Sequence, residues 1–218
     1  NSNKVIANDA ISFDINEGEF VVILGPSGAG KSTLLNIMGG MDNASEGSIN
    51  VFGKEIVGLS EDELTKYRRE DIGFVFQFYN LVPNLTAKEN VELAAEIVKD
   101  AWDAEEALEA VGLGHRLHNF PAQLSGGEQQ RVSIARAIAK KPKILLCDEP
   151  TGALDYQTGK QVLKILQEMS RDYGATVIIV THNTALAPLA NRVIHMHDAR
   201  VKSIVLNDSP QAIEELEY

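Results

Sequence analysis

A glycine-rich loop lies between a predicted strand and a predicted helix near the start of the chain. Its residues, Gly25-Pro26-Ser27-Gly28-Ala29-Gly30-Lys31-Ser32, fit the pattern G-x-x-x-x-G-K-[ST]. The apolar run Glu19–Gly25 precedes the loop, and the helical stretch Lys31–Gly40 follows it. Glycines allow several backbone amides to converge on one phosphate chain, and the helix N-terminus adds its dipole. The loop therefore predicts a nucleotide binder, although GTPases, kinases and recombinases share this feature.

Residues of the loop have separate expected roles. Lys31 is expected to neutralise the β- and γ-phosphates, and Ser32 is expected to ligate Mg²⁺. The residues expected to contact the nucleotide are Gly25, Pro26, Ser27, Gly28, Ala29, Gly30, Lys31, Ser32 and Thr33.

Short apolar runs alternate with helical stretches, which indicates the α/β class. Near-continuous apolar strands separated by helices are typical of a mostly parallel sheet that is covered on both faces. Near the end of the chain, two further runs flank Asp198-Ala199-Arg200 and predict a closing hairpin or two edge strands. Besides Glu19–Gly25, the predicted strands are Ile72–Phe78, Lys143–Asp148, Thr176–Thr181, Val193–His197 and Val201–Leu206.

The middle of the chain has a helical pattern without a convincing strand. Thr86 with Glu89, and Ser125 with Glu128, have the spacing of capping boxes. A further helical run covers Asp103–Val111, and the last helix is predicted to reach Lys141. We therefore expect one domain over residues 1–218, in which residues 85–141 form a helical subdomain. Residues 1–84 and 142–218 are expected to form the α/β core with its β part.

Charge and composition narrow the possible partners. The chain of 218 residues has 20 basic and 31 acidic residues, a formal net charge of −11, which argues against a broad nucleic-acid surface. No apolar run approaches the roughly 20 residues that a membrane helix needs. The single cysteine, Cys147, excludes an internal disulfide and is expected in the core.

Two acidic residues follow one of the predicted strands. Asp148 and Glu149 end the run Ile144-Leu145-Leu146-Cys147. Parallel strands deliver ligand-binding residues at their carboxyl ends. We expect Asp148 to hold Mg²⁺ near the phosphate loop and Glu149 to polarise an attacking water. This pair favours a hydrolase over a kinase, because a kinase has to exclude water.

A second potential anion-binding helix start lies in the helical region. Leu124-Ser125-Gly126-Gly127-Glu128-Gln129-Gln130-Arg131 places a serine cap and two glycines before a helix. One nucleotide has only one γ-phosphate, yet the chain has two such helix starts. We therefore expect each nucleotide to be sandwiched between two chains, with the phosphate loop of one chain facing the serine-glycine helix of the other.

These motifs together resemble those of ABC ATPases, and the resemblance covers essentially the whole chain. LSGGEQQR is similar to the family's signature sequence, and the remaining motifs follow in the family's order. They are the phosphate loop at residues 25–32, Gln77 in IGFVFQ, the signature at residues 124–128, ILLCDEP at 144–150, Ala153-Leu154-Asp155 and His182 in VTH. The resemblance implies an ABC ATPase fold with a mixed sheet core, an antiparallel β part and an all-helical subdomain.

Roles for individual residues follow from the same resemblance. Glu149 is implied as the catalytic base, and His182 as the residue that contacts the γ-phosphate. Gln77 is implied to join Mg²⁺ and water to the membrane-partner interface, and Asp155 to signal between the two sites. The catalytic set is Glu149, His182, Gln77 and Lys31, and the Mg²⁺ ligands are Ser32, Gln77 and Asp148. The signature residues acting on the opposite chain are Leu124, Ser125, Gly126, Gly127 and Glu128.

A narrower resemblance points to one subfamily. QLSGGEQQRVSIARAIAKKPKILLCDEPTGALD is similar to proteins that serve lipoprotein release, MacB-type efflux and FtsE-type cell division. It implies an ATP-hydrolysing homodimer with ATP and Mg²⁺, located on the cytoplasmic, inner face of the cell membrane. The implied partner is a separate permease with a large extracytoplasmic domain, used for efflux or mechanotransmission. The alternatives are an FtsE-like regulator that signals through a membrane partner, and a soluble ABC ATPase without a transporter.

The family's adenine-stacking aromatic residue is missing from its expected place. Before Gly25 the chain has only Phe13 and Phe20, and both are expected in the core. The expected tyrosine would fall at or before Asn1, so we expect that a native N-terminal segment is lacking. Trp102 is predicted to lie in the core, in a cap or on a partner-facing surface. The acidic tail Glu214–Tyr218 is predicted to fray, and Tyr79–Pro83 to border the groove for the permease.

Overall fold

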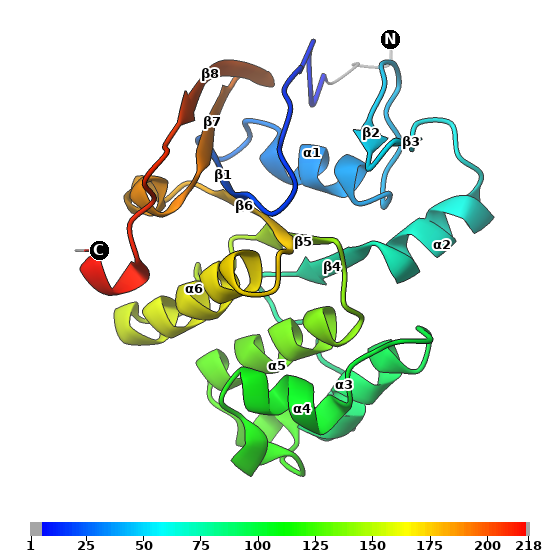
Figure 1. Cartoon of the computed structure of the whole chain (residues 1–218), viewed down its shortest axis with the longest axis vertical. Helices are drawn as coiled ribbons and strands as arrows, with labels where there is room; N and C mark the ends of the chain where they lie inside the picture. Colours follow the sequence, from blue (N-terminus) through cyan, green and yellow to red (C-terminus); the bar gives the residue numbers. More distant parts are fainter. Residues whose placement is uncertain (1–5, 217–218) are drawn as a thin grey trace, which may run out of the picture.

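A six-stranded sheet forms the centre of the protein in a computed structural model that describes residues 6–216 (Figure 1). The strand order is β4-β5-β6-β1-β7-β8. Neighbouring strands are parallel except β7 and β8, which form an antiparallel hairpin at one edge, so the sheet is mixed. The strands are β1 (Phe20–Leu24), β4 (Ile72–Val75), β5 (Ile144–Asp148), β6 (Thr176–Thr181), β7 (Arg192–His197) and β8 (Arg200–Leu206).

The central strands are apolar on both sides because both faces of the sheet are covered. All residues of β1 and of β6 are buried. Successive side chains of a strand point to opposite faces. Accordingly, Phe20, Val22 and Leu24 belong to one hydrophobic cluster, whereas Val21 and Ile23 belong to the other. The predicted mostly parallel sheet, covered on both faces, is confirmed.

Different helices cover the two faces. Leu34 and Leu35 of α1 and Tyr67 of α2 pack in the cluster of Val21, while α3, α4, α5 and α6 contribute to the cluster of Phe20. In Figure 1, α3, α4 and α5 form a separate group at the end of the molecule opposite to α1. The helices are α1 (Lys31–Met38), α2 (Glu61–Glu70), α3 (Ala87–Ala95), α4 (Ala104–Ala110), α5 (Gly126–Ala139) and α6 (Tyr156–Arg171).

Side-chain caps begin most of these helices. Thr86 and Ser125 form capping boxes with Glu89 and Glu128, as the spacing predicts. Asp103 caps α4. Between α4 and α5 lie two 3₁₀ turns, η1 (Gly114–Arg116) and η2 (Pro121–Gln123). Every element between Ala87 and Ala139 is thus helical, and the assignment of residues 85–141 as a subdomain stays a prediction.

The ends of several elements differ from the predicted ones. Strand β4 ends at Val75, not at Phe78, because Phe78 is exposed and the backbone of Tyr79 and Asn80 turns into the left-handed region. Helix α1 ends at Met38, before the two glycines. Helix α5 ends at Ala139, since Lys141 has a φ of 53° and cannot continue a helix.

Apart from the 3₁₀ turns, one helix and two strands were not predicted. Helix α2 begins at a capping box of Ser60 with Glu63, a pattern that the sequence contains. The strands β2 (Asn50–Val51) and β3 (Lys54–Glu55) form a small antiparallel hairpin. This hairpin lies next to α1 in Figure 1 and agrees with the expectation of an antiparallel β part.

The C-terminal tail is packed, so the prediction that it frays is wrong for its described residues. The turn η4 (Ile213–Glu215) follows the η3 turn (Thr184–Leu189) and β8, and Ile213 and Leu216 are buried. Lys164 of α6 forms an ion pair with Glu214 at 2.8 Å. The tail therefore closes the hydrophobic cluster beside α6.

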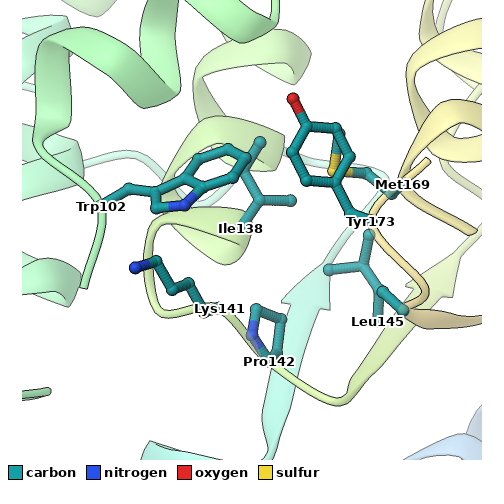
Figure 2. A pocket seen from close by; sticks show the side chains of 8 residues that line it. Trp102, Ile138, Lys141, Pro142, Leu145, Met169 and Tyr173 are labelled. Atoms are coloured by element: carbon teal, nitrogen blue, oxygen red, sulfur yellow. The ribbon is translucent and has the colours of Figure 1, made fainter. Parts of the chain in front are cut away.

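Trp102 lies at a junction between the helical group and the sheet. Its ring meets Tyr173 edge-on, with 5.0 Å between the ring centroids. Figure 2 shows both rings beside Lys141, Pro142 and Leu145 around a small apolar pocket, completed by Ile138, Met169 and Ala175. Phe13 packs against the second cluster, as expected, while the position expected for the tyrosine falls outside the described residues. No helix within residues 6–216 is long and apolar enough to cross a membrane.

Candidate active site

The candidate site residues gather at the carboxyl ends of neighbouring parallel strands. Leu24 of β1 pairs with Thr181 of β6, and Val180 pairs with Asp148 of β5. The residues that follow these strands therefore emerge at the same edge of the sheet, where open α/β sheets bind ligands. They are the phosphate loop after β1, Glu149 after β5 and His182 after β6.

The phosphate loop holds its lysine against its own backbone. Lys31 is 7% exposed, and its Nζ donates to the carbonyl oxygens of Gly25 at 2.8 Å and Pro26 at 3.0 Å. Gly30 has a φ of 89° and begins α1 without a side-chain cap. The backbone N–H groups of the first helical turn are therefore available to bind a ligand. A side chain at Gly30 would collide with the carbonyl of Ala7. This loop can bind phosphate oxygens.

A hydroxyl and a carboxylate meet beside the loop. Ser32 Oγ donates to Asp148 Oδ1 at 3.2 Å. Burial is the largest influence on the pKa of the Asp148 carboxyl and raises it; Glu149 adds to the rise, while Ser32 and Lys31 oppose it. Oxygen donors of these two kinds are the ligands that Mg²⁺ prefers, and a cation would relieve the buried negative charge. The residues present fit Mg²⁺.

Three hydrogen-bond donors surround the carboxylate of Glu149. His182 contributes its backbone N–H at 2.9 Å and its ring Nδ1 at 2.7 Å, both to Oε1. Thr181 Oγ1 donates to Oε2 at 2.7 Å. The backbone of Glu149 has a φ of 45°, which is uncommon for a residue other than glycine. The structure thus joins Glu149 to His182 directly, and it adds Thr181, which the sequence reasoning missed.

Gln77 lies beside the loop that follows Glu149. A β-carbon built on Gly152 would be 3.0 Å from Gln77 Nε2 and 3.4 Å from the β-carbon of Glu149. Gly152 also donates to the carbonyl of Glu149 at 3.0 Å. The structure therefore brings Gln77 next to the acidic loop, with Gly152 leaving the space for its amide.

The signature residues form a well-capped helix start. Ser125 Oγ accepts from the backbone N–H of Glu128, and the Glu128 carboxylate in turn accepts from the backbone N–H of Ser125. The same carboxylate forms an ion pair with Arg116 at 2.9 Å. The Ser125 backbone has the largest effect in lowering the pKa of Glu128, and the Ser125 hydroxyl and Arg116 lower it further. Leu124 is buried, whereas Ser125 is exposed. This end of α5 presents its serine to solvent.

Two side chains from other segments lie against the signature glycines. A β-carbon on Gly126 would be 2.8 Å from the Tyr79 hydroxyl, and one on Gly127 would collide with the methyl group of Thr158. Thr158 Oγ1 in turn donates to Asp155 Oδ2 at 2.6 Å, and Asp155 caps α6. Asp155 is thus connected to the signature of its own chain through Thr158, a residue that no sequence motif indicated.

The two helix starts lie apart in a single chain. Figure 1 shows α1 and α5 in opposite halves of the molecule. The structure therefore unites the phosphate loop with Asp148, Glu149 and His182, while the signature lies apart from them with Ser125 exposed and Leu124 and Gly127 buried.

Comparisons with known proteins agree with this geometry. The family model described as ABC transporter matches residues 8–152. A putative ABC transporter ATP-binding protein of Mycoplasma pneumoniae, the MG065 homolog, is 44% identical over 95% of this chain. The macrolide export ATP-binding/permease protein MacB of Wolinella succinogenes is 49% identical over 88% of this chain. The chain covers 45% and 30% of the lengths of these two relatives.

A solved structure extends the comparison to the fold. The dimeric post-hydrolysis state of the ATP-binding cassette MJ0796 bound to ADP and Pi superposes with a TM-score of 0.85 at 43% identity. The match covers 94% of this chain and 93% of the MJ0796 chain. The expected cassette fold with a mixed sheet is confirmed.

Proposed function

The chain belongs to the ABC transporter family, and from that premise we propose that it binds and hydrolyses ATP, as a pair of copies, to drive a membrane permease. The similarity to MacB, whose name combines an ATP-binding part with a permease, supports the membrane partner. We propose that the pair sits on the inner face of the membrane, and that the permease is a separate chain with a large extracytoplasmic domain.

The observation that carries the proposal is the position of Glu149. Its carboxylate lies between Thr181 and His182, beside the Ser32–Asp148 pair at the end of the phosphate loop. A carboxylate in this place can take a proton from a water that attacks the γ-phosphate. His182, whose side chain is 69% exposed, is free to turn toward that phosphate.

The phosphate loop supplies most of the remaining chemistry. Backbone amides at the start of α1 and Lys31 bind the phosphate oxygens and stabilise the charge that develops during transfer. Ser32, Asp148 and Gln77 would hold Mg²⁺, which neutralises phosphate charge when it is bound. Contributions of this kind position the reacting groups and require no covalent intermediate on the protein.

The signature residues act on the nucleotide of the second copy. Ser125 is exposed at a helix N-terminus, which suits binding of a γ-phosphate, whereas Gly127 is buried and allows Thr158 to pack closely against that turn. The dimeric MJ0796 structure with ADP and Pi supports this arrangement. Asp155, through Thr158, connects one site to the signature that serves the other.

The segment after Gln77 is the proposed contact for the permease. Phe78 is 76% exposed, and α3, whose Asn90 accepts from the backbone N–H of Val82 at 2.8 Å, exposes Leu93. An apolar surface of this kind is a common interaction site. Residues 85–141 move with this surface as the helical subdomain, against the core of residues 1–84 and 142–218.

Phosphate release tests the proposal. The purified chain, incubated with Mg²⁺ and ATP, should release inorganic phosphate at a steady rate. Glu149→Gln should reduce this rate at least about 100-fold, because it removes the base and keeps the shape of the side chain. Glu96→Gln, at an exposed carboxylate beyond α3, is the matched control and should leave the rate unchanged. Wild-type turnover by Glu149→Gln would refute the proposed role of Glu149.

A further inference from the structure

We propose that Thr181 is a positioning residue that holds the catalytic carboxylate of Glu149 at the end of β6. This inference rests on the proposed function of Glu149 as the base. Thr181 Oγ1 donates to Glu149 Oε2 at 2.7 Å, the same distance that separates Glu149 Oε1 from the ring of His182. The two oxygens of this carboxylate are therefore bonded by different side chains, Oε2 by Thr181 and Oε1 by His182.

The hydroxyl of Thr181 has a fixed direction. Its oxygen accepts a hydrogen bond from the backbone N–H of Asn183 at 3.1 Å. A hydroxyl has a single proton. Because the amide of Asn183 occupies the acceptor side of the oxygen, that proton points to Glu149. The side chain of Asn183 is itself engaged, since its Oδ1 accepts from the N–H of Ala185 at 3.0 Å.

The two side chains that bond Glu149 differ in how firmly they are held. Thr181 is 2% exposed and is the last residue of β6, where it pairs with Leu24 of the central strand β1. The side chain of His182, in contrast, is 69% exposed. A buried strand end is rigid, whereas an exposed side chain changes rotamer within nanoseconds. Thr181 is thus a permanent support of the carboxylate, as is the backbone N–H of His182, while the ring of His182 is the releasable one.

This difference matters during the proposed reaction. When His182 turns toward the γ-phosphate, it gives up its ring contact with Glu149 Oε1. Oε1 keeps its bond from the backbone N–H of His182, and the position that the ring leaves becomes available to the attacking water, while Thr181 keeps Oε2 in place. The left-handed backbone of Glu149 alone does not fix its side chain, so the aim of the base depends on Thr181 at Oε2 together with the backbone N–H of His182 at Oε1.

Substitutions of Thr181 separate its hydroxyl from its volume. Thr181→Val keeps the shape of the buried side chain and removes the donor. We expect kcat for ATP hydrolysis to fall about tenfold or more, while KM for ATP stays within about twofold, because the phosphate loop is untouched. Thr181→Ser restores the hydroxyl and should recover kcat to within about threefold of wild type. If Thr181→Val does not fold, Thr181→Ala provides the same loss of the donor.

The opposite end of the same strand offers a matched control. Thr176 is 3% exposed, and its hydroxyl accepts from the backbone N–H of Gly18 at 3.0 Å. Thr176→Val removes a buried hydroxyl from β6 at the end away from the site. It should lower the melting temperature and leave kcat unchanged. An equal loss of kcat in Thr176→Val and Thr181→Val would mean that Thr181→Val acts only by lowering the stability of the fold. That result would overturn the inference.

The same substitution made in the Glu149→Gln variant separates this inference from the proposed function. In Glu149→Gln, adding Thr181→Val should not lower the residual rate further, since both changes affect the same group. If Glu149→Gln is inactive but Thr181→Val keeps wild-type kcat, or if Thr181→Ser is as impaired as Thr181→Val, the inference on Thr181 is wrong and the proposed function stands. If Glu149→Gln itself turns over normally, the proposed function fails, whatever Thr181 does.

Discussion

The hydroxyl of Ser32 donates to Asp148 Oδ1 at 3.2 Å and thereby joins the first turn of α1 to the end of β5. This bond places the half-buried carboxylate of Asp148 beside the phosphate loop. Burial of the carboxylate raises its pKa, which means that the ionised form is disfavoured in the folded protein. The site therefore has an electrostatic cost that a bound cation removes.

Replacement of Asp148 tests whether its buried charge destabilises the ligand-free protein. Asp148→Asn keeps the shape and removes the buried charge. We expect the ligand-free protein to melt roughly 2–4 °C higher, the shift that about 1 kcal/mol produces in a chain of this size. The additional stabilisation by Mg²⁺ with ATP should be lost. Thermal unfolding with and without Mg²⁺ and ATP measures both effects, with Asp100→Asn as an exposed control. A variant that melts lower and still responds to Mg²⁺ would contradict this account.

The contact between Gly127 and Thr158 gives a prediction about packing. A side chain at Gly127 would collide with the methyl group of Thr158, so Gly127→Ala should destabilise the chain by about 1–3 kcal/mol. Urea unfolding measures the loss.

A double substitution shows whether this collision is the cause. Thr158→Ser removes the methyl group and keeps the hydroxyl that bonds Asp155. Gly127→Ala combined with Thr158→Ser should recover at least half of the lost stability. If the two changes are simply additive, the loss arises elsewhere.

Arg136 of α5 fixes the segment after Gln77. Its guanidinium donates to the carbonyls of Asn80 at 2.6 Å and Tyr79 at 3.0 Å, two residues with left-handed backbones. Arg136→Lys cannot reproduce this fork. We expect chymotrypsin to cleave after Phe78 and Tyr79 several times faster in this variant, as followed by mass spectrometry. Arg131 lies on the same helix as Arg136 and donates to the carbonyl of Val111, so Arg131→Gln loses that bond but should not accelerate cleavage after Phe78 and Tyr79. Equal rates in both variants would argue against the anchoring role.

The apolar strands of the sheet were predictable because burial on both faces requires long apolar runs. The same criterion failed at Phe78, where an apolar residue is exposed, and at α2, where only Leu64 and Tyr67 are buried. The capping box of Ser60 and Glu63 marks the start of α2 in the sequence. The strands β2 and β3 have two residues each, too few for a period of two to be recognised.

The members of the candidate site were predictable from motifs, whereas their contacts were not. Motif order places Glu149 and His182 at neighbouring strand ends, but the hydrogen bonds between them depend on side-chain rotamers. Thr181 and Thr158 escaped notice because a single threonine within an apolar strand or a helix resembles any other. Only the fold reveals that one faces a carboxylate and the other a glycine.

Lys140 gives a prediction for the dependence of stability on pH. Its Nζ donates to the carbonyls of Arg68 and Ile72, and burial lowers its pKa to about 8. Above about pH 8 the folded state therefore holds fewer protons than the unfolded state, so this group makes the free energy of unfolding rise with pH. Between pH 7.5 and about 9.5, wild type should gain stability relative to Lys140→Met. Urea unfolding across this range measures the difference, and parallel curves would contradict the prediction.

The mass of Glu149→Gln in solution tests the central claim most directly. With Mg²⁺ and ATP, this variant should form a dimer by light scattering, because unhydrolysed γ-phosphates remain shared between the two copies. Without nucleotide it should be a monomer, and adding Ser125→Arg should abolish the dimer even with ATP. A Glu149→Gln chain that binds ATP but stays monomeric at every concentration, or whose dimer survives Ser125→Arg, would contradict an ATP site built from the phosphate loop of one copy and the signature of the other.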